Sequence, residues 1–443
     1  MIIKKIINSI NPKIEAIKIR DQHAQSIYNE KNLKSSIQQI MQSVKHDGDQ
    51  ALIKLTEKFD KVKLDSNEIR VSETEIQNAY TQVSDDFIDA ITFVKNRVEN
   101  LSKITLDRLQ YTYDQEKNIN IKSLVRPIDS VGCYVPGGSA SYPTTFIMSC
   151  VTSKVAQVPR IAVCIPPDLD KSINALTLAT AHLIGIKEIY RIGGAQAIAA
   201  LTYGTESIKP VKKIVGPGNR YVTMAKMLVN QELRVNMPFP PRIDLPAGPS
   251  EVLIIADSSA NPRFIALDMI AQAEHGVHSI VGLVTTSKYI ADKVIMELSS
   301  LTVNAPRNEI VTKSLGTHGF IVICKDISDV ITFVNEFAPE HLEIMNKNPE
   351  VIINKINHAG LILVGDFTPA SVSDYGIGTN HILPTNATAS VYSGLSVIDF
   401  VKIINVVNVS KTGLEKMINK IKILAESEGL FNHSLAVEKR FKN

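Results

Sequence analysis

Gln272 and His275 are three residues apart in the run Ala271-Gln-Ala-Glu-His-Gly276. Side chains at this spacing share one face of a helix, so an amide oxygen and an imidazole nitrogen could reach the same metal ion. Gly276 suits the end of such a helix. The motif is short, and a histidine in an ordinary structural role is the alternative. The pair is therefore a candidate metal site that needs further ligands from elsewhere in the chain.

A carboxylate and an imidazole are adjacent at Glu340 and His341, directly after Pro339. Proline is favoured at the first position of a helix, so the sequence predicts that both side chains lie in a first helical turn. Once partly buried, both groups can exchange protons near neutral pH, which makes them a candidate acid–base pair. The alternative is a charged helix start, because the helix dipole favours a carboxylate there.

A long polar stretch punctuated by glycines, residues 365–384, follows the apolar run Leu361–Val364. Ligands in α/β proteins bind at the carboxyl ends of strands, on loops of this kind. Asp374 is a candidate metal ligand and His381 a candidate substrate contact. The alternative is a glycine-rich surface turn, although long structured loops tend to be functional.

The elements that position these residues begin near Val131, where short β-branched runs start to alternate with helical stretches. Such alternation is typical of parallel sheets joined by crossover helices. The residues before about 125 show helical periodicity, as does the tail from Lys411. The proline-rich stretch 236–249 separates two of the strand–helix series. The sequence therefore predicts an α/β fold with two Rossmann-like domains, each with a parallel-sheet core, plus helical N-terminal and C-terminal extensions.

Length and composition exclude several classes of protein. The chain has 443 residues, 44% of them hydrophobic, and a net charge of +3, which gives no case for nucleic acid as the main partner. No apolar run approaches the ~18 residues of a membrane helix, and no secretory signal is visible. The four cysteines form no CxxC pair, as is typical of a reducing compartment. We expect a cytoplasmic enzyme that has neither a nucleic-acid nor a membrane partner.

Eight segments, taken in order, resemble the histidinol dehydrogenase family and span the chain from about residue 125 to its end. They are Val131-Gly-Cys-Tyr-Val-Pro-Gly-Gly-Ser139, Gly193-Gly-Ala-Gln-Ala-Ile-Ala-Ala200, Val215-Gly-Pro-Gly-Asn219, Asp244-Leu-Pro-Ala-Gly-Pro-Ser-Glu-Val252, Ala271–Gly276, Ala338–His341, Asp374–Pro384 and Ser393-Gly-Leu-Ser-Val397. The resemblance implies a zinc- and NAD-dependent four-electron oxidation of L-histidinol, via L-histidinal, to L-histidine. These are the last steps of histidine biosynthesis.

The resemblance also implies roles for individual residues. The residues that match the zinc ligands are Gln272, His275, Asp374 and His433, the last supplied by the partner subunit of a homodimer with shared active sites. Glu340 and His341 match the catalytic pair. The positions that match substrate contacts are Ser250, Gln272, His275, His341, Asp374, His381, Glu428 and His433. The NAD-binding positions are matched by Tyr134, Gln196 and Asn219.

On this basis we divide the chain into four parts. Residues 1–30 form an N-terminal helical segment, residues 31–133 and 250–395 an α/β domain with the zinc and catalytic residues, residues 134–249 an α/β domain on the NAD side, and residues 396–443 a helical tail that reaches the partner subunit.

Three positions after Gly276 depart from the family pattern: His278, Ile280 and Gly282. His278 invites the role of an extra metal ligand, but we expect it to be exposed or hydrogen-bonded instead. Two alternatives to histidinol oxidation stay open. One is a family member that oxidises a different small hydroxy substrate. The other is a zinc hydrolase or a non-catalytic metal-binding protein, which the missing GxGxxG dinucleotide fingerprint favours.

Overall fold

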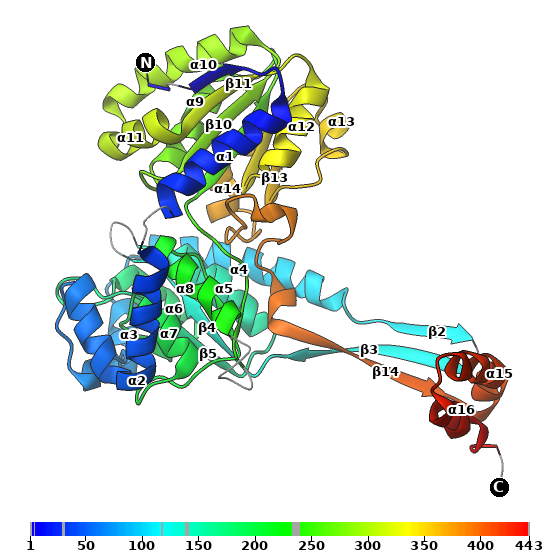
Figure 1. Ribbon diagram of the computed structural model, residues 1–443. Helices are drawn as coiled ribbons and strands as arrows, with labels where there is room; N and C mark the ends of the chain where they lie inside the picture. Colours follow the sequence, from blue (N-terminus) through cyan, green and yellow to red (C-terminus); the bar gives the residue numbers. More distant parts are fainter. Residues whose placement is uncertain are drawn as a thin grey trace.

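Two parallel sheets and one antiparallel sheet organise the chain (Figure 1). The computed structural model describes residues 2–3, 5–28, 32–116, 118–137, 141–232 and 240–441. The parallel sheets lie one above the other with helices packed around each, and the antiparallel sheet projects away from both as an arm. The predicted α/β fold with two parallel-sheet cores is confirmed.

The larger parallel sheet has six strands, and its central strands are buried on both faces. Burial on both faces explains why these strands read as continuous apolar runs in the sequence. In spatial order they are β1 (Lys5–Asn8), β11 (Gly319–Ile323), β10 (Ile280–Thr285), β9 (Glu251–Ala256), β12 (His341–Met345) and β13 (Leu361–Val364). The helices of this half are α1 (Pro12–Tyr28), α9 (Pro262–Ala273), α10 (Lys288–Leu301), α11 (Asn308–His318), α12 (Ile327–Phe337), α13 (Pro349–Ile353) and α14 (Ala370–Tyr375).

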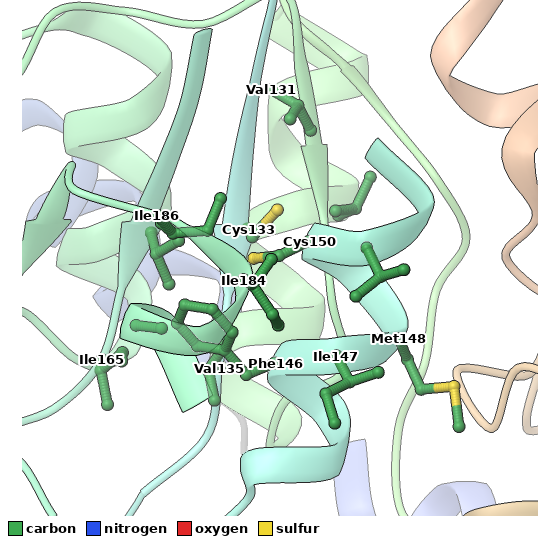
Figure 2. Close-up of a cluster of buried hydrophobic side chains, with 14 of the residues drawn as sticks. Val131, Cys133, Val135, Phe146, Ile147, Met148, Cys150, Ile165, Ile184 and Ile186 are labelled. Atoms are coloured by element: carbon green, nitrogen blue, oxygen red, sulfur yellow. The ribbon is translucent and has the colours of Figure 1, made fainter. Parts of the chain in front are cut away.

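The second parallel sheet has five strands, in the order β6 (Ile189–Tyr190), β5 (Arg160–Cys164), β4 (Ser130–Tyr134), β7 (Lys213–Val215) and β8 (Arg242–Ile243). Its helices are α2 (Leu33–Phe59), α3 (Glu73–Tyr80), α4 (Asp85–Asp107), α5 (Pro143–Val155), α6 (Ala175–Ile184), α7 (Gly194–Tyr203) and α8 (Arg220–Glu232). Figure 2 shows part of the core, where Cys133 and Val135 lie among Phe146, Ile147 and Cys150 of α5. All four cysteines are free and buried.

The arm is an antiparallel sheet in the order β14 (Val401–Val409), β3 (Ile119–Pro127) and β2 (Thr112–Glu116). It carries α15 (Lys411–Ser427) and α16 (Phe431–Glu438) at its far end (Figure 1). β14 exposes Ile403, Ile404, Val406 and Val407 within one chain. The tail is helical from Lys411, as predicted, but residues 401–409 of the proposed helical segment 396–443 form a strand, so the helices stand at the end of an arm with an uncovered apolar surface.

Short 3₁₀ turns complete the fold at η1 (Ser66–Glu68), η2 (Thr302–Asn304), η3 (Thr388–Ser390) and η4 (Val397–Phe400). Within the described ranges, none of the helices combines the length and apolarity that a membrane span requires.

The N-terminal part of the chain is less helical than the sequence predicts, because it also contains β1, β2 and β3. β1 pairs with β11, and β3 pairs with β14, both far away in the sequence. Local periodicity carries no information about such distant partners, so these strands were missed.

The packing of α2, α3 and α4 differs from the proposed division of the chain. α2 lies against α7, α3 against α6 and α4 against α5, all on the five-stranded sheet. The helices between residues 33 and 107 therefore lie with residues 134–249 rather than with residues 250–395, whereas β2 and β3 belong to the arm. β8 also belongs to the five-stranded sheet, so the chain passes from this sheet to β9 of the six-stranded sheet after Ile243. Of the proline-rich stretch, residues 236–239 lie outside the described residues.

Candidate active site

A cavity of about 490 Å³ lies between the two parallel sheets. On one side it is lined by Ser250, Glu340 and His341, at the amino ends of β9 and β12. On the other side it is lined by Tyr134 and Asn219, which end or follow β4 and β7. The site therefore joins the amino edge of the six-stranded sheet to the carboxyl edge of the five-stranded sheet.

Glu340 and His341 form the polar centre of this cavity, but not in a helical turn. α12 ends at Phe337, and Ala338 takes a left-handed conformation with φ 48°, which turns the chain before Pro339. β12 then begins at His341. The predicted first helical turn is wrong, because the proline here leads into a buried strand beside β9.

The backbone of Glu251 orients both side chains of the pair. Its amide nitrogen donates a hydrogen bond to Glu340 Oε2 at 2.6 Å. Its carbonyl oxygen lies 3.2 Å from His341 Nδ1, so Nδ1–H donates to it. Among the described residues, His341 Nε2 is buried without a hydrogen-bond partner. The hydrogen bond from Nδ1 to the Glu251 carbonyl therefore fixes the orientation of the His341 ring, and Nε2 stays free to exchange a proton with a substrate.

The protonation of His341 is set by two opposing effects. Burial alone would lower the pKa of His341, but the Glu340 carboxylate, 3.5 Å from Nδ1, acts together with Asp374 and the Glu251 carbonyl to raise it to about 9. When no metal ion is bound in the cavity, the imidazole of His341 is therefore protonated at neutral pH. A cation bound in the same cavity would favour the neutral ring, because like charges disfavour each other.

Glu251 is a functional residue that the sequence reasoning missed. Its side chain is 2% exposed, and burial raises its pKa to about 8, so the carboxyl group is mostly neutral at pH 7. One of its oxygens accepts a hydrogen bond from the amide of Asn386 at 2.7 Å. The sequence feature that could have indicated this role is a charged residue directly before the apolar run Val252–Ile255.

The candidate metal ligands come from two separate helices. Gln272 is buried on α9, and among the described residues its Nε2 has no hydrogen-bond partner. His275 lies just beyond the end of α9, where its backbone amide bonds to the carbonyl of Gln272. Asp374 lies on α14. All three line the cavity, so the structure brings together residues about 100 positions apart.

Asp374 reaches the cavity by a different route from the one expected. The sequence predicts a loop at the carboxyl end of its own strand, β13. Instead α14 follows β13, and Asp374 faces the same cavity as residues at the amino ends of β9 and β12. The expected edge of the sheet is therefore wrong, although Asp374 itself is at the site.

His381 is held beside Asp374. Its Nδ1 lies 3.5 Å from Asp374 Oδ1, and its Nε2 lies 3.0 Å from Thr145 Oγ1. Burial lowers the pKa of His381 despite the nearby carboxylate. A neutral imidazole that lines the cavity suits contact with a polar substrate.

The candidate cofactor positions divide into two kinds. Tyr134 and Asn219 line the cavity, and the Tyr134 hydroxyl accepts a hydrogen bond from the amide of Gly194 at 3.2 Å. Gly216 has φ +117° and passes so close to Tyr134 that an added Cβ would lie 2.1 Å from its carbonyl oxygen. Gln196 is buried on α7 and does not line the cavity.

Glu428 and His433 are far from this cavity within one chain. Both are exposed, and they lie at the end of α15 and in α16, at the tip of the arm (Figure 1). A single chain therefore does not bring its own His433 to Gln272, His275 and Asp374.

His278 lies on the rim of the cavity in a small cluster of histidines. Its carbonyl oxygen is 2.8 Å from His23 Nε2, and its ring centroid is 5.8 Å from that of His318. Burial lowers the pKa of His23 and of His318 to about 4, so both rings are neutral at pH 7. The cluster connects α1 to the segment after the candidate metal helix.

A cavity between two parallel sheets, lined by an acid–base pair and by metal-binding types of side chain, defines an α/β enzyme. A family model described as histidinol dehydrogenase matches residues 23–441. The chain belongs to the histidinol dehydrogenase family, and it is therefore an oxidoreductase of histidine biosynthesis that acts on histidinol.

Individual relatives agree with this placement. The chain is 40% identical over 442 residues to a histidinol dehydrogenase of Methanocaldococcus jannaschii. The alignment covers 100% of this chain and 99% of the relative. It is 43% identical over 403 residues to that of Clostridium acetobutylicum, covering 91% of each. The crystal structure of a histidinol dehydrogenase from Elizabethkingia anophelis matches with a TM-score of 0.90 and 38% identity, covering 100% of this chain and 98% of that one.

Proposed function

We propose that this chain uses zinc and NAD to oxidise L-histidinol through L-histidinal to L-histidine, at an active site shared between two subunits of a homodimer. The observation that carries the proposal is the single cavity that Glu340 and His341 share with Gln272, His275 and Asp374. An acid–base pair beside candidate metal ligands suits an oxidation that must both anchor its substrate and remove protons from it.

The residues present fit a zinc ion. Gln272 and Asp374 supply oxygen and His275 supplies nitrogen, and with His433 of a second copy the set becomes two nitrogens and two oxygens, which is a borderline set that suits zinc. Gln272 is buried and lines the cavity, and among the described residues its Nε2 has no hydrogen-bond partner, so its amide is free to turn Oε1 toward a metal ion. When bound, zinc would hold the amine and imidazole of histidinol and orient its alcohol carbon.

Tyr134 and Asn219 support the NAD assignment. Both lie at the carboxyl edge of the five-stranded sheet, where parallel α/β sheets bind nucleotides. Gln196, buried away from the cavity, has weaker support as a cofactor contact. When bound, NAD supplies the hydride acceptor.

His341 takes protons in both oxidations. Nε2 accepts the hydroxyl proton of the alcohol as hydride leaves its carbon, which gives the aldehyde. Glu340 then removes a proton from water as the water adds to the aldehyde carbon. Nε2 of His341 accepts a hydroxyl proton from the resulting hydrate while a second hydride leaves, which gives the acid. Ser250 and His381, together with Glu428 of the second copy, would contact the substrate.

The arm supports a dimer with shared sites. It holds Glu428 and His433 away from their own cavity and exposes apolar side chains along β14. An apolar surface of this kind is typical of an interface, and a two-fold axis would let each tail reach the other subunit. The cytoplasmic location stays a prediction, which agrees with the four free cysteines.

Mixed dimers test the shared site. Chains with His341→Asn and chains with His433→Asn should each be nearly inactive alone. After the two are mixed through denaturation and refolding, half of the dimers carry one chain of each kind, and one of the two sites in such a dimer is intact. NADH production should therefore recover to about a quarter of the wild-type rate. No recovery, with mixed dimers verified by two tags, would overturn the assignment of His433 to the partner's site.

Glu340→Gln should separate the two oxidations. Glutamine cannot act as a general base, so oxidation of histidinal should fall by about a hundredfold or more. Oxidation of histidinol to the aldehyde should fall much less, because loss of the Glu340 charge lowers the pKa of His341 toward neutral pH. Supplying histidinol and histidinal separately measures both steps. Equal losses would contradict this division of roles.

A further inference from the structure

We propose that the buried ion pair of Lys226 and Asp244 positions the NAD side of the cavity by binding both backbone polar groups of Gly216. The proposal deepens the proposed function, because it rests on the assignment of Tyr134 and Asn219 to NAD binding. Neither Lys226 nor Asp244 lines the cavity, so both are positioning residues.

The two charged side chains come from neighbouring elements of the five-stranded half. Lys226 lies on α8, and Asp244 directly follows β8. Lys226 Nζ is 2.6 Å from Asp244 Oδ1, and the two side chains are 1% and 0% exposed. A buried ion pair seldom stabilises a fold more than apolar side chains of similar volume would. Its role therefore follows from the groups that it binds.

Both backbone polar groups of Gly216 are bonded to this pair. The amide of Gly216 donates a hydrogen bond to Asp244 Oδ2 at 2.9 Å, and its carbonyl oxygen accepts one from Lys226 Nζ at 2.8 Å. Both hydrogen bonds are buried, so water cannot take the place of either charged group. The ion pair therefore fixes the peptide groups on both sides of Gly216.

Gly216 makes the turn that leads the chain from β7 to the wall of the cavity. Its φ of +117° and its close approach to the Tyr134 carbonyl both require glycine. The residues that follow, Pro217 to Asn219, line the cavity. Asn219 Oδ1 then caps α8, because it accepts hydrogen bonds from two amides of the first turn at 3.0 and 3.2 Å. The turn at Gly216 thus sets the position of Asn219 and of the start of α8 relative to Tyr134.

The contacts form a closed ring through α8. The helix begins at the cavity beside Asn219, and Lys226, about two turns later, binds back to Gly216. If the ion pair is lost, Gly216 can rotate, and Asn219 no longer keeps a fixed position relative to Tyr134. The candidate zinc ligands are carried by α9 and α14 instead. Loss of the pair should therefore weaken NAD binding and leave zinc binding unchanged.

Titration of the purified full chain with NAD, followed by the heat of binding, tests the proposal. The double variant Lys226→Met/Asp244→Asn leaves no unpaired charge in the core, and its asparagine oxygen can still accept from the Gly216 amide. The donor to the Gly216 carbonyl is lost. The hydroxyl of Thr223, which donates to the Ala247 carbonyl at 2.7 Å, still holds α8 to the segment after β8. The dissociation constant for NAD should rise by about tenfold or more, with cooperative unfolding and zinc content retained.

Lys213→Met is the matched control. Lys213 lies on β7 and pairs with Asp399 at 2.8 Å, but it does not line the cavity. Its affinity for NAD should stay within about twofold of wild type. Lys226→Met alone is the second variant in case the double variant does not fold, because the buried carboxyl group of Asp244 can then take up a proton. It should weaken NAD binding in the same way.

Steady-state kinetics and hydrogen exchange separate positioning from general support of the fold. In the double variant the KM for NAD should rise, the KM for histidinol should stay within about twofold of wild type, and the first amides of α8 should exchange faster. Wild-type NAD affinity together with wild-type exchange would overturn the positioning role, and so would an equal loss of zinc and NAD binding. If the wild type binds no NAD, the cofactor assignment fails, and the exchange at the start of α8 still decides whether the pair holds Gly216.

Discussion

His341→Asn should reduce the oxidation of both histidinol and histidinal by about a thousandfold or more, because the general base of both steps is lost. Asparagine is close in size to histidine and its amide can still donate to the carbonyl of Glu251. It offers no basic nitrogen at the position of Nε2, the buried atom that has no hydrogen-bond partner in the described part of the chain. Steady-state rates with each substrate measure the effect.

The pH dependence gives this variant a second readout. Only the neutral ring of His341 can accept a proton, and Glu340 raises its pKa to about 9 in the protein without other cations. The wild-type rate should therefore rise as pH increases toward the His341 pKa, with a bound cation shifting the rise to lower pH. His341→Asn should lack this rise while it keeps wild-type zinc content and folding. A variant that retains a tenth of wild-type activity on either substrate would contradict the assigned role.

Removal of zinc should abolish turnover, to below about 1% of the original rate, without unfolding the protein. Gln272 and His275 lie on and just after α9, which packs on β9 and β10 through core residues such as Ala266 and Met269. Asp374 lies on α14, which packs against α9. Metal analysis, NADH production and thermal unfolding should be followed together during chelation.

Readdition of zinc is the control for chelation, and it should restore the rate. Unchanged NADH production after metal analysis shows complete removal would disprove the zinc role. A complete loss of cooperative unfolding would instead mean that the metal organises the fold, which would contradict the packing of α9 on the sheet and of α14 on α9.

The strands and helices of the sheet regions were largely predictable, because the information that defines them is local. Val252–Ile255 and Val281–Val284 are short apolar runs between turn residues, and both form buried central strands. β3 and β14 were not predictable in the same way, because each is stabilised by the other across a long stretch of sequence. The edge strand β1 was missed for the same reason.

The candidate site shows the same division between local and distant information. The spacing of Gln272 and His275 placed them together, since the contact is made within about one helical turn. The turn at Ala338 was not predictable, because a left-handed conformation at alanine is rare and sends Pro339 into a strand. The backbone amide of Glu251 binds the side chain of Glu340, which is far away in the sequence, so nothing near Glu251 in the sequence signals this role.

The central claim is that one site carries out two successive oxidations of histidinol, and the yield of NADH per histidinol tests it most directly. A limiting amount of L-histidinol is given to the purified protein with excess NAD until the absorbance of NADH stops rising. The account predicts two NADH for each histidinol, with L-histidine as the final product and no accumulation of histidinal. One NADH for each histidinol with histidinal as the product, or no NADH at all, would contradict it.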